Sequence, residues 1–209
     1  MNNRQTQRTY PDTTTVAFTY NTAGRRLSAT TPTGTTSYAY DATQRLVRKT
    51  DPAGRKVEYG YDSAGRQASL TATVGPNTWA TNYSFDGAGR MVGVIDPAGR
   101  AFSMSHDAQG MMATLVRPNG VQSSYTHDNR GRLANIRTFK VAGNTTIASY
   151  AYAVGVSGLR NAITEGDGTV RAYAYDDVAR LVGEDVSGGG GPQYTKTFAY
   201  GSVSNRISQ

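Results

Sequence analysis

The sequence predicts an all-β fold in which antiparallel hairpins with a recurring Tyr-Asp turn form one continuous sheet. Three observations indicate it: aromatic residues alternate with small ones, turn residues recur at nearly fixed intervals, and no helical period of 3.6 persists beyond a few residues. A period of two places residues on one face of a strand. The 24 glycines among 209 residues point to many turns.

The repeat is measured from the residue, usually aromatic, that precedes each main turn. The positions are Tyr20, Tyr40, Tyr61, Phe85, His106, His127, Tyr152, Tyr175 and Tyr200. They are spaced by 20 to 25 residues and cover almost the whole chain. The spacing predicts a single domain over residues 1–209, made of about nine units with incomplete units at both ends, as in a fragment or in a chain that another copy completes.

A second turn lies half-way along each unit, so a unit is expected to be strand, turn, strand, turn. Pro, Asn, Asp and Gly, the residues that tight turns favour, mark these half-way turns. They are Pro32–Gly34, Asp51–Gly54, Gly75–Asn77, Asp96–Gly99, Pro118–Gly120, Gly143–Asn144, Asp167–Gly168 and the Gly188–Gly191 run.

The strands before the main turns carry two columns of aromatic residues on one face. Val16, Phe18 and Tyr20 set the pattern, and the other units repeat it. About sixteen large side chains form too large an apolar patch for a soluble monomer to leave open. We therefore expect this face to be buried or to line a lumen; the alternative is an exposed platform that stacks sugar rings.

Each main turn is expected to use the same local chemistry. Its Asp accepts a hydrogen bond from the backbone N–H two residues on, its Gly supplies a positive φ, and its Arg pairs with the Asp or lies over a ring. Imperfect copies, with Gln44 and Ala179 in place of Gly, suit a structural repeat better than a catalytic one. The predicted motif residues are Tyr20, Gly24, Arg25, Tyr40, Asp41, Tyr61, Asp62, Gly65, Arg66, Phe85, Asp86, Gly89, Arg90, Asp128, Gly131, Arg132, Tyr175 and Asp176.

The pattern Tyr-Asp-x-x-Gly-Arg, repeated over residues 10 to 209 with Asp-Pro-x-Gly turns between, resembles the YD-repeat or RHS (rearrangement hot spot) family. The resemblance implies a long antiparallel sheet that spirals into a hollow shell or barrel. In toxin members this shell encloses an effector, and in surface members it supports adhesion, in some cases with carbohydrate binding. The chain departs from the family in showing no core-closing region, because its Asp-Pro-Ala-Gly turns continue into Arg55 and Arg100 inside ordinary repeats.

Candidate sites for catalysis or metal binding are few. His106 and His127 occupy the same slot of adjacent units, about 9.6 Å apart if two strands separate them. That distance is too long for one metal with nitrogens at about 2.1 Å, so both are expected to replace Tyr as packing residues. Glu165–Gly168 lacks the ligand spacing of an EF-hand and is expected to be a hairpin turn. We predict no enzyme, no cofactor and no metal.

The charge and the remaining composition restrict the partners. The net charge of +7 is scattered, which argues against a nucleic-acid site, and no run of about 18 apolar residues could span a membrane. The resemblance implies a secreted or cell-surface bacterial protein, although the chain shows no signal peptide. The predicted role is the wall of an RHS-type shell around a toxin or effector polypeptide, with that cargo or further shell segments as partners. Alternatives are a surface module that binds carbohydrate, and a filament in which identical subunits join through open sheet edges.

Overall fold

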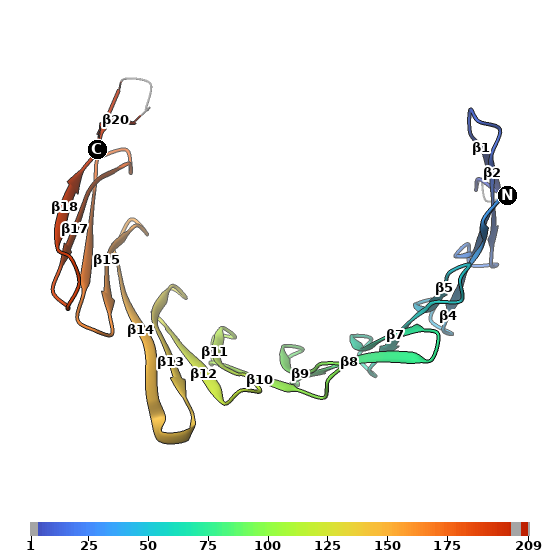
Figure 1. Cartoon of the computed structure of the whole chain (residues 1–209), viewed down its shortest axis with the longest axis horizontal. Helices are drawn as coiled ribbons and strands as arrows, with labels where there is room; N and C mark the ends of the chain where they lie inside the picture. Colours follow the sequence, from blue (N-terminus) through green and yellow to red (C-terminus); the bar gives the residue numbers. More distant parts are fainter. Residues whose placement is uncertain (1–3, 202–205, 209) are drawn as a thin grey trace. The chain divides into compact units, whose positions relative to one another are not determined.

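The computed structural model describes residues 4–201 and 206–208 and is all-β (Figure 1). It divides into two compact units, Met1–Ala101 and Phe102–Gln209. The first unit contains β1 (Gln7–Thr9), β2 (Thr15–Tyr20), β3 (Arg26–Thr31), β4 (Gly34–Tyr40), β5 (Leu46–Thr50), β6 (Lys56–Tyr61), β7 (Gln67–Val74), β8 (Asn77–Phe85) and β9 (Met91–Ile95).

The second unit contains further strands and one short 3-10 turn. Its elements are β10 (Ala101–His106), β11 (Met112–Val116), β12 (Val121–His127), β13 (Leu133–Lys140), η1 (Ala142–Asn144), β14 (Thr145–Val154), β15 (Arg160–Glu165), β16 (Val170–Tyr175), β17 (Leu181–Ser187), β18 (Tyr194–Thr197), β19 (Ala199–Tyr200) and β20 (Arg206–Ser208). The predicted all-β fold of antiparallel hairpins is confirmed. The single domain of about nine units stays a prediction.

Within each unit, successive strands from β1 to β9 and from β10 to β18 pair in antiparallel register, and β19 pairs separately with β20. Pairs such as β6 with β7 and β16 with β17 skip one residue where the strand enters the main turn, between Gly60 and Tyr61 and between Ala174 and Tyr175. This skip is the bulge that accompanies a short loop ending in a left-handed residue. It places the first aromatic column, which consists of the residues directly before the main turns, beside those turns.

The sheet of each unit is a single layer. Among the described residues only Val186, Ser123 and Thr169 are fully buried. The accessible surface of the chain is 13349 Å², whereas a globular protein of this mass exposes about 9,400 Å². Contacts between adjacent strands must therefore supply the cohesion that a core supplies elsewhere.

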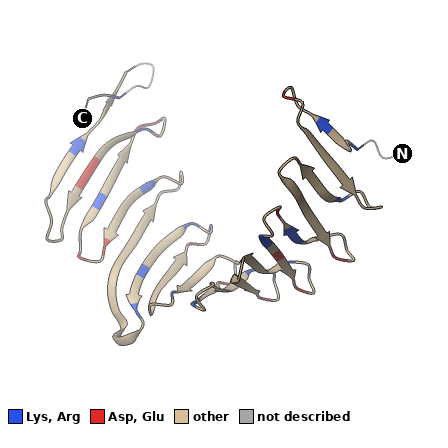
Figure 2. Cartoon of the chain, turned by 45° about the vertical axis from the view of Figure 1, so that its right-hand side comes forward, with Lys and Arg blue, Asp and Glu red and all other residues tan. Residues whose placement is uncertain are grey.

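The two faces of the sheet differ in character. In β4, Thr36, Tyr38 and Tyr40 are half-buried, while the residues between them are exposed. The opposite face carries mostly small residues, linked across strands by hydroxyl pairs such as Thr19 with Ser28 at 2.6 Å. In each unit Lys and Arg are distributed over strands and turns rather than gathered in one patch (Figure 2).

In the seventh strand–turn repeat, the main turn begins two residues later than the sequence predicts. The backbone bonds that close its main turn run from Gly155 N–H to Leu159 O and from Gly158 N–H to Gly155 O. We call the position directly before a main turn the ring slot. The residue before this turn is Val154, so Val154 and not Tyr152 occupies the ring slot. Tyr152 belongs to the second aromatic column, two residues before the slot.

Candidate functional site

The main turns of each unit form a series that we call the turn ladder. Its members are the turns 21–25, 41–45, 62–66 and 86–90 in the first unit and 107–111, 128–132, 155–159 and 176–180 in the second. In each turn the first residue donates its N–H to the carbonyl of the fifth, and the fourth donates to the carbonyl of the first; in turn 62–66 both distances are 2.9 Å. The fourth residue has positive φ, +83° at Gly65, which explains the preference for glycine there.

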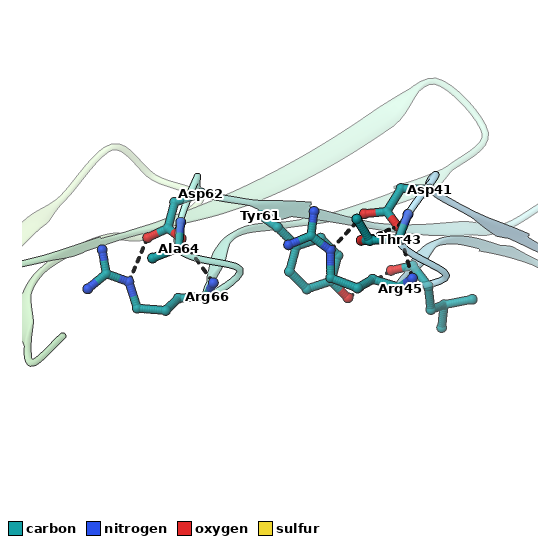
Figure 3. A network of polar contacts seen from close by, with 8 residues as sticks. Asp41, Thr43, Arg45, Tyr61, Asp62, Ala64 and Arg66 are labelled. Carbon is teal, nitrogen blue, oxygen red and sulfur yellow. Dashed lines mark hydrogen bonds and ion pairs between the residues drawn. The ribbon is translucent and has the colours of Figure 1, made fainter.

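The aspartate that opens a turn holds both the turn and the arginine that closes it (Figure 3). Asp41 Oδ1 accepts the backbone N–H groups of Thr43 and Arg45, each at 2.9 Å. Asp41 Oδ2 accepts Arg45 Nε–H at 2.7 Å. The Arg45 N–H, above all, lowers the pKa of Asp41 to about 2, so this carboxylate stays ionised at neutral pH.

The same arginine then reaches the aromatic ring of the following repeat. The Arg45 guanidinium lies 4.4 Å from the centroid of the Tyr61 ring, within the range of a cation–π contact (Figure 3). The Tyr61 hydroxyl donates to the carbonyl of Leu46, the residue after Arg45, at 2.9 Å. Carboxylate, guanidinium, ring and backbone thus form one closed set of contacts, which we call a joint.

Other joints repeat this geometry. Arg66 lies over Phe85 at 4.7 Å and Arg180 over Tyr200 at 4.8 Å. Hydroxyl groups of the slot tyrosines reach back to the preceding unit in the same way, as Tyr175 does to the carbonyl of Arg160 at 3.0 Å. A turn that recurs at this spacing therefore connects successive hairpins of one sheet.

The model of the teneurin YD-shell family matches residues 1–184. The chain belongs to this family. Among solved structures, the YD-shell chain is similar to a chain of the TcdB2-TccC3 crystal structure, with 15% identity, 90% of this chain and 14% of that chain covered, and a TM-score of 0.51. A likeness at this identity shows the fold alone.

A second similar structure is the Photorhabdus luminescens Tc holotoxin pore, with 15% identity over 95% of this chain and 15% of that chain. Its TM-score is 0.45. The YD-shell chain thus spans about one seventh of the length of the toxin chains that it matches. No curated protein matches.

The sequence-predicted motif residues all lie in the turn ladder or in the ring slots beside it. Asp62, Asp86, Asp128 and Asp176 bind the backbone and side chain of their arginine as Asp41 does. In the first turn, Asn21 takes the place of Asp, and its Oδ1 accepts the Arg25 N–H at 2.8 Å. Gly24, Gly65, Gly89 and Gly131 all have positive φ.

Two features of this edge chemistry were not predicted from the sequence. One is the set of tyrosine hydroxyl bonds to the preceding repeat. The other is the Asp–Arg pair in the Asp-Pro-Ala-Gly turns, where Asp51 with Arg55 and Asp96 with Arg100 repeat the pair of the main turns on the opposite edge. The signal was present, because both turns continue into Arg at the spacing of the main turn.

The two histidines lie in ring slots but differ in their contacts. His127 Nδ1 is 3.3 Å from Asp107 Oδ2, and its side chain is only 14% exposed. Asp107 opens the turn that Met111, not Arg, closes, so here the histidine of the next slot takes over the contact with the carboxylate. His106 Nδ1 is buried with no hydrogen-bond partner among the described residues.

Neither histidine belongs to a group of three or more metal-ligating side chains in the described part of the chain. Residues 4–201 and 206–208 also contain no helix that is long and apolar enough to cross a membrane.

Proposed function

We propose that this chain is a non-catalytic wall segment of a hollow shell that encloses a polypeptide, such as a toxin or effector. The observation that carries the proposal is the ladder of joints in a single-layer sheet of the YD-shell family. Such a sheet is stabilised by the joints along its edge and by packing within its aromatic columns. Its aromatic face is only half-covered by the chain itself, which suits a wall that faces enclosed protein. The same role implies secretion or display at the cell surface.

The use of the acidic side chains supports a structural rather than a catalytic role. A general acid needs a carboxyl with a raised pKa in a cleft. Hydrogen bonds to Arg66 N–H and to Arg90 N–H, the largest contributions in each case, instead keep the pKa values of Asp62 and Asp86 below the usual range. These carboxylates act as fixed acceptors that shape a turn.

Protease protection tests the shell directly. The chain is expressed together with the coding sequence contiguous with it, and the purified product is treated with proteinase K. We expect an enclosed segment to resist cleavage until denaturant opens the wall. Arg45→Ala, which removes a joint, should shorten that protection, whereas Val178→Ala, at a residue that is 68% exposed, should not. Digestion of every segment at the rate of an unfolded chain would refute enclosure.

One observation favours carbohydrate binding as a second candidate. Trp79 lies on the aromatic face in β8, opposite Ala72, and remains 46% exposed. An exposed indole can stack on a sugar ring, whereas Tyr61 is already covered by Arg45. Glycan-array binding that Trp79→Ala abolishes would support this function. Binding that survives Trp79→Ala would remove its basis.

A further inference from the structure

The hairpin formed by β13 and β14 is longer than its neighbours in the second unit and reaches past them (Figure 1). On one side, β12 pairs with β13 along the full length of β13. On the other side, β15 pairs with β14 only from Tyr150 to Val154. Among the described strands, none pairs with Thr145–Ser149 on this side. Gly166, the residue after β15, lies against Ser149, since a Cβ added to Gly166 would be 3.4 Å from the Ser149 backbone nitrogen. The overhang therefore presents an open strand edge of about four residues, Thr145–Ala148.

This edge forms one wall of an open groove. The groove is lined by Thr146–Tyr150 of β14 and, on the other wall, by the half-way turn at Glu165, Gly166 and Asp167. Thr146, Ala148 and Ser149 are small, so another backbone can approach β14 closely. Ile147 is 55% exposed and offers an apolar contact at the centre of the edge.

The pairing of β13 with β14 skips a residue at this point. Thr138 is opposite Ala148 and Phe139 is opposite Thr146, so Ile147 has no cross-strand partner. A bulge of this kind prevents a long strand from adding in register. The edge thus admits a short extended segment rather than a continuation of the sheet.

Charged side chains of both signs lie near the groove, and Arg137 donates its Nε–H to Thr146 Oγ1 at 3.0 Å. The only charged residues that line the groove itself are Glu165 and Asp167. Glu165 is paired with Arg171 at 2.7 Å. Asp167 accepts the backbone N–H of Thr169 at 2.8 Å, a bond that lowers the pKa of Asp167 and keeps it anionic at neutral pH. An incoming basic side chain therefore finds an ionised carboxylate at the rim.

We propose that the overhang of β14 is a strand-addition site for an extended peptide that carries a basic residue. The peptide backbone pairs with Thr145–Ala148, an apolar side chain contacts Ile147, and the basic side chain faces Asp167. A second copy of the chain fits less well, because the same edge of that copy presents only the uncharged Thr145–Ala148 to Asp167. This site does not depend on the proposed shell.

The probe is a capped, fluorescein-labelled peptide Lys-Thr-Val-Thr-Val-Lys, with binding to the full chain followed by fluorescence anisotropy. We expect saturable binding that weakens roughly tenfold when both lysines are replaced by glutamate. Ile147→Lys should reduce affinity by a similar factor, because the lysine side chain obstructs the strand edge and its charge repels the lysines of the peptide. Val156→Lys is the matched control, since Val156 is 92% exposed in a main turn of the same unit.

A second pair of variants isolates the carboxylate. Asp167→Asn keeps the acceptor for Thr169 N–H and removes the charge, so affinity should fall about threefold to tenfold. Asp177→Asn makes the same change in an exposed turn away from the groove and should leave affinity unchanged. Circular dichroism checks that each variant is folded. Equal effects of Ile147→Lys and Val156→Lys, or of the two Asn variants, would overturn the site. Self-association that Ile147→Lys abolishes without peptide would assign the edge to a second copy instead.

Discussion

Two joints of the turn ladder connect neighbouring hairpins through different side chains that meet the turn carboxylate. In the first unit, Asp41 holds Arg45, and the Arg45 guanidinium lies over the Tyr61 ring. In the second unit, the carboxylate of Asp107 is reached directly by His127 from the following slot, and Met111 stands where the arginine is elsewhere. The side chain that meets the carboxylate thus comes from the turn itself in one joint and from the following ring slot in the other.

The difference shows what a joint requires. A carboxylate fixed by its own turn must meet a cation or donor that also contacts the next hairpin. The arginine joint has a permanent charge and two further contacts, the ring face and the hydroxyl bond. In the histidine joint, His127 Nδ1 lies 3.3 Å from Asp107 Oδ2. The arginine joint should therefore stabilise the sheet more, and the variants below test that ranking.

The largest effect is expected on removing the ring of an arginine joint. Tyr61→Ala should lower the free energy of unfolding by about 2 kcal/mol, less than for a fully buried aromatic because Tyr61 is half-buried. His127→Ala should cost about 1 kcal/mol, since it removes a smaller ring and one long hydrogen bond. Urea-induced unfolding followed by circular dichroism measures both.

A conservative variant separates the parts of the Tyr61 joint. Tyr61→Phe keeps the ring under Arg45 and loses only the bond to Leu46, at a cost of about 1 kcal/mol. If His127→Ala destabilises the chain as much as Tyr61→Ala does, the ranking of the joints is wrong.

The next effect concerns the fourth residue of the main turn, which has positive φ and is Gly in most turns but Gln44 or Ala179 in two of them. Gly65→Ala should cost about 1–2 kcal/mol, because φ at Gly65 is +83°. Ala179 already adopts φ of +66° in the equivalent position. Ala179→Gly should therefore stabilise the chain by about 0.5 kcal/mol, the relief of strain less the added freedom of the unfolded chain.

Ala174→Gly serves as the control for that change. Ala174 lies in β16, where the backbone is extended, so glycine there should destabilise by about 0.5–1 kcal/mol. Destabilisation by Ala179→Gly of the same size as by Ala174→Gly would show that the turn position is not strained.

The sequence was sufficient to predict strands, turns and the Asp contacts within a turn, because these depend on residues close together in the chain. Alternation of Tyr38 and Tyr40 predicts a strand face, and Asp62 with Gly65 predicts the turn. The seventh unit was misplaced by two residues because Tyr152 resembles a slot residue more than Val154 does. Gly158, whose φ is +84°, marked the correct turn.

The contacts between neighbouring repeats could be predicted only in part: an arginine over a ring was expected as an alternative to its pair with Asp, but not which ring it would meet. The cation–π contact of Arg45 with Tyr61 and the bond from Tyr61 to Leu46 join residues about one hairpin apart. Their existence depends on the register of two intervening strands, which the motif alone does not specify. The overhang of β14 likewise follows from the unequal lengths of β14 and β15.

A smaller effect is expected when the histidine joint is converted to the arginine type. In a double-mutant cycle, Met111→Arg and His127→Tyr should each be nearly neutral or destabilising, because each alone leaves half a joint. Together they should show a favourable coupling of about 0.5–1 kcal/mol, the usual range for an arginine over an aromatic ring. Additive changes in the urea midpoint would mean that the two slots do not interact.

The smallest effect is expected from the charge of a single turn, because solvent screens a partly exposed pair. The pKa of Asp41 is lowered to about 2, chiefly by the Arg45 N–H, whereas an unfolded aspartate titrates near 3.9. The carboxylate thus binds protons more weakly in the folded state. Its stabilising contribution is fully present above about pH 4 and is lost as the pH falls towards 2.

Asp41→Asn keeps an Oδ1 acceptor, as Asn21 does in the first turn, but cannot titrate. Between pH 5 and pH 2 the midpoint temperature of thermal unfolding should therefore fall less steeply in Asp41→Asn than in the wild type. The reciprocal change, Asn21→Asp, should make the slope steeper because it adds a titrating turn. Parallel curves for all three proteins would mean that the turn aspartates act only as hydrogen-bond acceptors, and that the arginine joint derives its strength from the ring contact instead.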